Sequence, residues 1–210
     1  MSGVQKKALA DLQKVTAGCT RCALHSGRTN MVFGAGNEDA ELMLVGEGPG
    51  RQEDLLGLPF VGPAGKLLDR LLTGVGLSRD EVYITNVVKC RPPGNRDPHP
   101  DESRSCDPIL KKQLEIIRPL IICALGRIAS GILLKRTVQI TRMHGMLISV
   151  NGYNIVPVFH PAAALRGGNA MSGITEDFQK LKEYLENAPR PAPDRSHGPG
   201  TPVPEQLELF

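Results

Sequence analysis

Apolar residues follow two spacings along this chain, one typical of buried strands and the other of amphipathic helices. Short uninterrupted apolar runs, several rich in β-branched residues, predict strands buried on both faces. Between them, apolar residues recur at helical spacing, which predicts helices. The predicted strands are 41–46, 81–90, 119–126 and the second arm of a hairpin that turns at Asn151-Gly152 and ends at 159–161. The predicted helices are 4–17, 64–76, one that begins near Asp101 and restarts at Asp107-Pro108, 127–134 and 175–188.

This alternation of strands and helices predicts an α/β domain on a largely parallel sheet. In such sheets a ligand binds in the crevice beyond the carboxyl ends of the strands. Three polar segments lie at those ends: GEGPG at 46–50, Asn86, and HPAAALR at 160–166. We therefore expect these segments to meet at one active site.

The loop after the first strand, 46–65, combines flexibility with acidic residues. It holds six glycines and three prolines beside Glu47, Glu53 and Asp54. Glycines such as Gly48 let backbone N–H groups approach a ligand where a side chain would collide. The loop is therefore typical of a binding site rather than of a simple connection.

Composition narrows the class of protein. The 210 residues, 40% hydrophobic and 22% charged, suffice for one soluble globular domain with tails. The net charge of +3 permits an anionic partner without requiring one. The longest apolar runs are far shorter than the roughly 20 residues of a membrane helix, and the first residues lack the apolar core of a signal peptide. We expect a cytosolic protein.

The chain has five cysteines, and an odd number in a protein expected to be cytosolic argues against a disulfide framework. Cys19 and Cys22 form a C-x2-C pair in a polar loop, and Cys90 and Cys106 follow the second strand. Four thiolates can bind one zinc ion or one [4Fe–4S] cluster, and the spacing does not decide between them. The alternative is four unpaired structural cysteines. Cys123 lies inside an apolar run and is expected to be a small core residue.

Four segments together resemble the iron–sulfur (family 4) uracil-DNA glycosylases. They are GEGPGRQED (46–54), GLPFVGPAGKLLDRLL (57–72), VYITNVVKCRPPGNRDPHPDE (82–102) and FHPAAALR (159–166). The match runs from about Cys19 to Leu185. It implies a base-excision repair hydrolase that cleaves the N-glycosidic bond of uracil in DNA and leaves an abasic site. It also implies a three-layer α/β/α sandwich on a four-stranded sheet, with an N-terminal helix and a structural [4Fe–4S] cluster on the four cysteines.

The resemblance assigns the flipped uracil to two residues. Phe60 would stack on the base, and the amide of Asn86 would donate to O4 and accept from N3–H, a pattern that cytosine inverts. The structural alternatives are a phenylalanine that anchors the loop and an asparagine that caps a turn. Asn86 stands where the strand-end argument expects a ligand, and Phe60 is a conspicuous aromatic residue in the glycine- and proline-rich loop.

Three residues are candidates for the chemistry. His160 would donate to uracil O2 as negative charge develops there, the alternative being a surface histidine before a turn proline. Glu47 would stabilise the positive sugar or position a water molecule. Glu53 would share that work or brace the loop, and the two roles stay open.

The DNA face is expected around three arginines, of which Arg166 is the candidate phosphate ligand; the other two are Arg91 and Arg96. A related subfamily crosslinks to the abasic sugar through a histidine in a Lys/Arg-rich loop. The loop around His99 is shorter and lacks the basic run, so His99 is expected on the surface. A uracil-DNA binder or crosslinker remains the first rival interpretation.

The C-terminal segment differs in composition from the domain at 1–188. Residues 189–205 are rich in proline and predict a disordered linker. QLELF at 206–210 resembles the bacterial sliding-clamp-binding motif, the alternative being a tail that folds back. A monomeric, cytoplasmic, nucleoid-associated enzyme is then expected, with a clamp-associated iron–sulfur or zinc adaptor as the second rival. The expected motif residues are Gln206, Leu207, Leu209 and Phe210.

Overall fold

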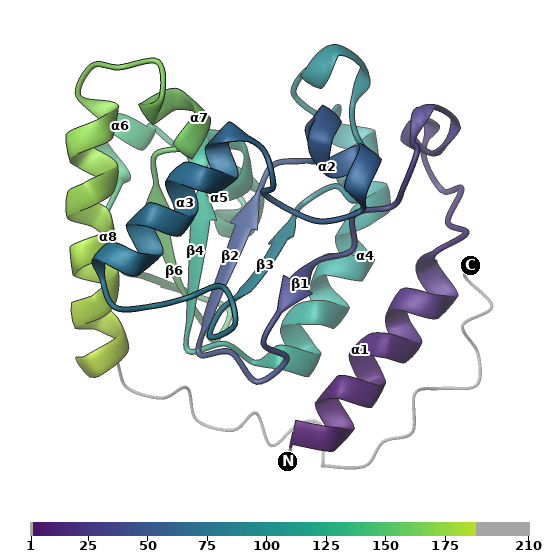
Figure 1. Cartoon of the computed structure of the whole chain (residues 1–210), viewed down its shortest axis with the longest axis horizontal. Coiled ribbons are helices and arrows are strands. Elements are labelled where there is room, and N and C mark those ends of the chain that lie inside the picture. Colours follow the sequence, from purple (N-terminus) through teal and green to yellow (C-terminus); the bar gives the residue numbers. More distant parts are fainter. Residues whose placement is uncertain (1, 188–210) are drawn as a thin grey trace.

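Four parallel strands form the centre of a single sheet in the computed structural model, which describes residues 2–187 (Figure 1). Every residue of β2 and β4 is buried, because helices cover both faces of the sheet. This burial explains the uniformly apolar runs in the sequence. The central strands are β3 (Tyr83–Asn86), β2 (Leu42–Gly46), β4 (Ile121–Leu125) and β6 (Tyr153–Val158), in that order across the sheet.

Two short antiparallel strands extend this centre to six strands, so the expected number of four is wrong. β1 (Ala35–Gly36) pairs with β3 at one edge, and β5 (Ile148–Val150) pairs with β6 at the other. The predicted hairpin turn is confirmed, since Asn151 (φ 51°) and Gly152 (φ 78°) both take left-handed conformations. β1 carries no alternating pattern over its two residues, and for that reason the sequence did not reveal it.

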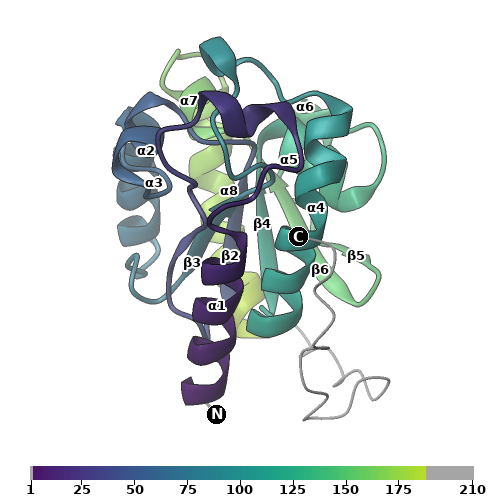
Figure 2. The same cartoon turned by 90° about the vertical axis from the view of Figure 1, so that its right-hand side faces the viewer.

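Helices cover both faces of the sheet and give the expected three-layer α/β/α sandwich. Apolar side chains of α1, α4 and α5 pack on one face together with Met43 and Val45. Those of α3 and α8 pack on the other face with Leu42 and Leu44. Figure 2 shows α3 and α4 on opposite sides of the sheet. These helices are α1 (Ser2–Thr16), α3 (Pro63–Gly74), α4 (Pro100–Ile117), α5 (Gly126–Leu134) and α8 (Ala170–Asn187).

Two helical expectations need correction. The helix α4 runs without interruption through Pro108, which lies inside it rather than starting a second helix. An interior proline loses one hydrogen bond and crowds the carbonyl four residues earlier, but the buried apolar face of α4 continues on both sides of Pro108. The glycine-rich loop contains a short helix, α2 (Arg51–Leu56), which the dense glycine and proline signals concealed. The remaining short helices are η1 (Ala23–Gly27), η2 (Pro93–Asn95), α6 (Ile140–Met143) and α7 (Pro161–Ala164).

None of the helices within residues 2–187 combines the length and apolar character needed to cross a membrane. The predicted linker at 189–205 and the predicted clamp motif at 206–210 lie outside the described residues.

Candidate active site

The three polar segments that follow the strands lie at one edge of the sheet, as the sequence predicts. Gly46, the last residue of β2, pairs in parallel register with Asn86, the last residue of β3. Val158 of β6 pairs with the last residue of β4, and His160 follows two positions later at the start of α7. The carboxyl ends of the central strands thus bring residues from distant parts of the chain together.

Phe60 and Asn86 flank the backbone of Gly46, and the His160 ring lies near the Phe60 ring, beside Gly126. A methyl group on Gly46 would lie 2.4 Å from Asn86 Oδ1 and 2.7 Å from Phe60 Cζ. The Phe60 and His160 rings are 6.0 Å apart between centroids. Only glycine fits at this position, and its missing side chain lets an aromatic face and an amide share one small space.

The Asn86 side chain presents a free acceptor there. Asn86 is buried, and its Oδ1 has no hydrogen-bond partner among residues 2–187. Its backbone is fixed, because Lys89 Nζ donates to the Asn86 carbonyl at 2.7 Å. Buried polar atoms are nearly always satisfied, so an orphaned acceptor beside an aromatic ring marks a place for a ligand donor.

His160 is held as a neutral donor. The Ala162 N–H donates to His160 Nδ1 at 3.1 Å, so the ring proton lies on Nε2. Burial, and to a smaller extent the charge of Arg166, lowers the pKa of His160 to about 4. The imidazole is therefore uncharged at neutral pH and has one N–H to donate.

Glu47 has a carboxyl group that titrates near neutrality. Burial raises the pKa of Glu47 to about 7, and the carboxylate of Asp97 adds to the increase. Arg127, which binds Asp97 at 2.9 Å, opposes the increase. Sequence reasoning missed Asp97 and Arg127. Arg127 follows the end of β4 by two residues, so the strand-end rule could have found it.

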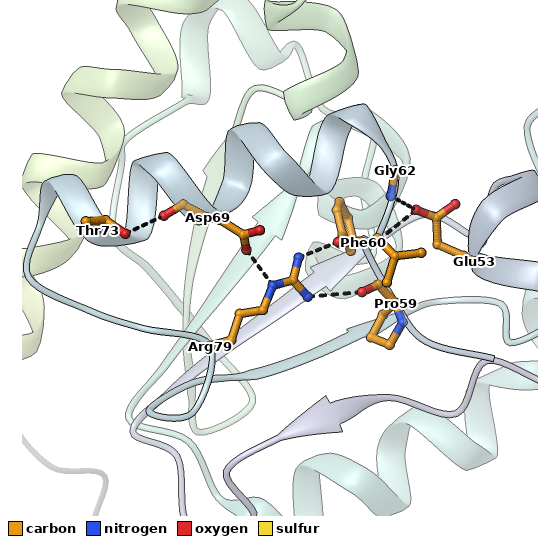
Figure 3. A network of polar contacts seen from close by, with 8 residues as sticks. Glu53, Pro59, Phe60, Gly62, Asp69, Thr73 and Arg79 are labelled. Carbon is orange, nitrogen blue, oxygen red and sulfur yellow. Dashed lines mark hydrogen bonds and ion pairs between the residues drawn. The ribbon is translucent and has the colours of Figure 1, made fainter. Parts of the chain in front are cut away.

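Glu53 is engaged by the loop that carries Phe60 (Figure 3). Its Oε1 accepts hydrogen bonds from Val61 N–H at 3.0 Å and Gly62 N–H at 2.9 Å. These contacts correspond to the bracing role, one of the two roles left open above. Gly48 brings the backbone close to the segment that follows β3, since a methyl group there would lie 2.8 Å from Val88 Cγ2.

The four candidate cysteines line one small cavity beneath η1. Cys90 and Cys106 are buried, Cys19 and Cys22 are half-buried, and all are free thiols. Cys123 is a fully buried core residue of β4, as expected. A set of four cysteines contributed by an N-terminal loop, a strand end and a helix has the chemistry of a shared metal site.

The surroundings of the cysteines suit a negatively charged group. Arg28 Nη1 lies 3.3 Å from Cys90 Sγ and donates to the Cys19 carbonyl at 2.7 Å. No three His, Cys, Asp or Glu side chains within residues 2–187 are placed to hold a single metal ion. A [4Fe–4S] cluster differs from zinc because each thiolate binds a different iron, so the sulfur atoms need not meet around one ion.

The expected DNA-contacting residues differ in availability. Arg166 is exposed just beyond α7. Arg96 is bound to both carboxylate oxygens of Glu102, at 2.7 and 2.8 Å, and Arg91 donates to Asn95. His99 is exposed at the start of α4.

Comparisons with known proteins agree with these features. A family model described as the uracil DNA glycosylase superfamily matches residues 33–187. The type-4 uracil-DNA glycosylase of Archaeoglobus fulgidus is 44% identical over 185 residues, 84% of this chain and 93% of that protein. Its counterpart in Saccharolobus solfataricus is 48% identical over 180 residues (81% and 83%), and that of Thermotoga maritima is 46% identical over 172 residues (80% and 90%).

Proposed function

Because this chain belongs to the uracil-DNA glycosylase superfamily, we propose that it removes uracil from DNA by hydrolysing the N-glycosidic bond and leaves an abasic site. The names of its type-4 relatives support this activity. The observation that carries the proposal is the buried, unpartnered Oδ1 of Asn86 beside Gly46 and Phe60.

Base recognition follows from the polarity of that amide. Asn86 Oδ1 accepts the N3–H of a flipped uracil, and Nδ2 donates to O4. Cytosine has an acceptor at N3 and a donor at C4, so it would leave both amide groups mismatched in a buried place. Phe60 supplies the stacking face, and the missing side chain of Gly46 leaves room between the two.

Two residues are proposed to assist bond cleavage, one by stabilising negative charge on the base and the other by stabilising positive charge on the sugar. The Nε2–H of neutral His160 donates to uracil O2 and stabilises the base as the C1′–N1 bond breaks. The Glu47 carboxylate stabilises the positive sugar and accepts a proton from the water that bonds to C1′. That proton finally resides on the released uracil, so water is the only co-reactant. Glu53 acts by bracing the loop.

The four cysteines are proposed to hold a [4Fe–4S] cluster; the ligands are Cys19, Cys22, Cys90 and Cys106. When bound, the cluster cross-links the N-terminal segment to the sheet and does not take part in the reaction. The basic Arg28 beside Cys90 balances its negative charge.

We further propose that Arg166 binds DNA phosphates and that the C-terminal motif binds a bacterial sliding clamp. The enzyme is proposed to be a monomer in the cytoplasm, near the nucleoid. The clamp proposal rests on the sequence of residues 206–210. Removing 188–210 should abolish binding to purified clamp and leave uracil release from short oligonucleotides unchanged. Equal clamp binding by the full and shortened chains would contradict it.

The activity is tested with a fluorescent oligonucleotide that carries one uracil, resolved on a denaturing gel with and without hot alkali. We expect cleavage that depends on alkali, largely lost in Asn86→Ala and retained in Asn187→Ala, a change at the exposed end of α8. A shifted band that survives denaturation would indicate a crosslinker and return attention to His99. Absence of product and of a shifted band would exclude the enzyme and favour the clamp-associated adaptor.

A further inference from the structure

The loop that presents Phe60 has an unfavourable backbone conformation. Phe60 has a φ of 52°, in the left-handed region that bulky L-residues rarely adopt, yet its side chain is buried. The loop also lies tightly on the first turn of α3, where a methyl group on Gly65 would meet the Phe60 carbonyl at 1.7 Å. Such a conformation persists only where the surrounding structure enforces it.

Arg79 provides that enforcement from one side (Figure 3). This residue, 19 positions after Phe60, lies between α3 and β3 and donates to two successive carbonyls of the loop. Its Nη1 donates to the Pro59 carbonyl at 3.2 Å, and its Nη2 donates to the Phe60 carbonyl. Its Nε binds the carboxylate of Asp69 on α3. The planar guanidinium therefore fixes the loop relative to the helix through three donors.

Glu53 completes the support from the other side. Its carboxylate accepts from the N–H groups of the next two residues, Val61 and Gly62. A cation thus holds two carbonyls and an anion holds two N–H groups of four successive residues. Neither charged group belongs to the set around Gly46, and both act on the backbone that aims the Phe60 ring at it.

We propose that Arg79, oriented by Asp69, is a positioning residue that holds Phe60 in its left-handed conformation and so determines how well the enzyme captures a flipped uracil. The identity of the captured base rests on the proposed function. Lysine cannot replace Arg79, since a single ammonium group does not span two carbonyls and a carboxylate in one plane.

The position of the ring can be measured without any activity. The protein labelled with 4-fluorophenylalanine should give a Phe60 signal, assigned by its loss in Phe60→Leu, among the five phenylalanines of the chain. In Arg79→Gln this signal should shift or broaden while the other four stay in place. Arg70→Gln, an exposed arginine on α3, should leave all signals unchanged. An unchanged Phe60 signal in Arg79→Gln would overturn the proposal, and movement of all signals would indicate general loosening instead.

The consequence for uracil release is tested by a double-mutant cycle under single-turnover conditions. Arg79→Gln and Arg79→Lys should each lower the rate about tenfold to a hundredfold in the wild-type background. In a Phe60→Ala background the same changes should matter less than about twofold, because the residue on which Arg79 acts is gone. An equal loss in both backgrounds would overturn the proposal.

Two further experiments distinguish failure of this proposal from misfolding of the variant and from failure of the proposed function. If Arg79→Gln does not fold, Asp69→Asn and Arg79→Lys, which keep most of the packing, provide both measurements. If the wild-type protein releases no uracil, the proposed function fails, while the fluorine spectra still decide whether Arg79 positions Phe60.

Discussion

The role proposed for Glu47 requires its negatively charged carboxylate, which its buried surroundings disfavour. Burial and the neighbouring Asp97 raise its pKa to about 7, so that about half of the molecules carry the carboxylate at neutral pH. Only the ionised form can stabilise a positive sugar or accept a proton from water. Activity should therefore rise with pH through a midpoint at about 7 and level off roughly one pH unit above it. His160 adds no transition in this range, because its pKa is about 4.

We predict opposite effects from the two charged neighbours of Glu47. Asp97→Asn removes a negative charge and should move the midpoint of the pH–rate curve below about 7. Arg127→Gln removes a positive charge and should move it above about 7. Single-turnover rates across the pH range measure both, with Glu47→Gln as the control that lacks the transition. Shifts in the same direction for both variants would contradict this electrostatic account.

The same carboxyl group should make the protein less stable in alkali. Its pKa in the folded state lies above the unfolded value of 4.5, so the folded state keeps a proton that the unfolded state loses between about pH 4.5 and 7. Stability contributed by this proton is lost as the pH rises through that window. Glu47→Gln should then be more stable than wild type by about 1–2 kcal/mol at about pH 8, where wild-type Glu47 is charged.

Urea unfolding at two pH values checks this expectation. At about pH 4 the two proteins should differ little, since Glu47 is protonated in both the folded and the unfolded wild type. A difference of the same size at about pH 4 and about pH 8 would mean that packing, not ionisation, explains the effect.

Sequence reasoning identified the residues that are proposed to contact the base and missed the charged residues beside them. Asn86 and His160 follow strand ends, so their positions follow from the order of strands and helices. Asp97 and Arg79 become neighbours of Glu47 and Phe60 only through tertiary packing, whereas Arg127 follows a strand end and was overlooked. Charged side chains in turns carry no local signal that distinguishes such a role from ordinary surface charge.

At the scale of elements, two glycines with open surroundings allow the effect of backbone conformation on stability to be measured without an effect of packing. Nothing lies within 4 Å of a methyl group on Gly152 of the hairpin turn or on Gly74 at the end of α3. Gly152 has a φ of 78°, whereas Gly74 is helical. Gly152→Ala should lower the free energy of unfolding by about 1 kcal/mol, and Gly74→Ala should raise it by up to about 1 kcal/mol.

Thermal or urea unfolding measures both changes, and neither should alter uracil release. A stabilising Gly152→Ala would contradict the turn assignment.

These two glycines also show which elements can be predicted from the sequence. The Asn-Gly pair identified the hairpin, and the closing glycines marked the end of α3. The helix α2 escaped notice because its six residues lie between glycines that fit a loop equally well.

At the scale of the whole molecule, the four candidate cysteines bring the N-terminal segment around η1 together with the loop after β3 and with α4. Loss of the proposed cluster should loosen the segment that contains α1 and η1. We expect Cys22→Ser to lose iron and visible absorbance and to lower the free energy of unfolding by about 2–4 kcal/mol, as the loss of a covalent cross-link does. Limited proteolysis should then cut between α1 and β1.

Cys123→Ala is the matched control, because Cys123 is buried in β4 away from the cavity of the other cysteines. It should retain full iron content. Iron retained in Cys22→Ser, or a metal analysis that finds zinc instead, would contradict the cluster. The sequence predicted four ligands in two pairs, but the spacing of cysteines alone did not distinguish the two metals.

The helix α8 starts soon after the loop of His160 and runs 18 residues, about 27 Å, to the opposite edge of the sheet (Figure 1). The C-terminal end of α8 therefore lies at the edge of the sheet away from the candidate active site. The proposed clamp motif follows this end of α8 in the sequence, so we expect clamp binding and substrate binding to be compatible. The proposed enzyme could then release uracil while it stays bound to the clamp.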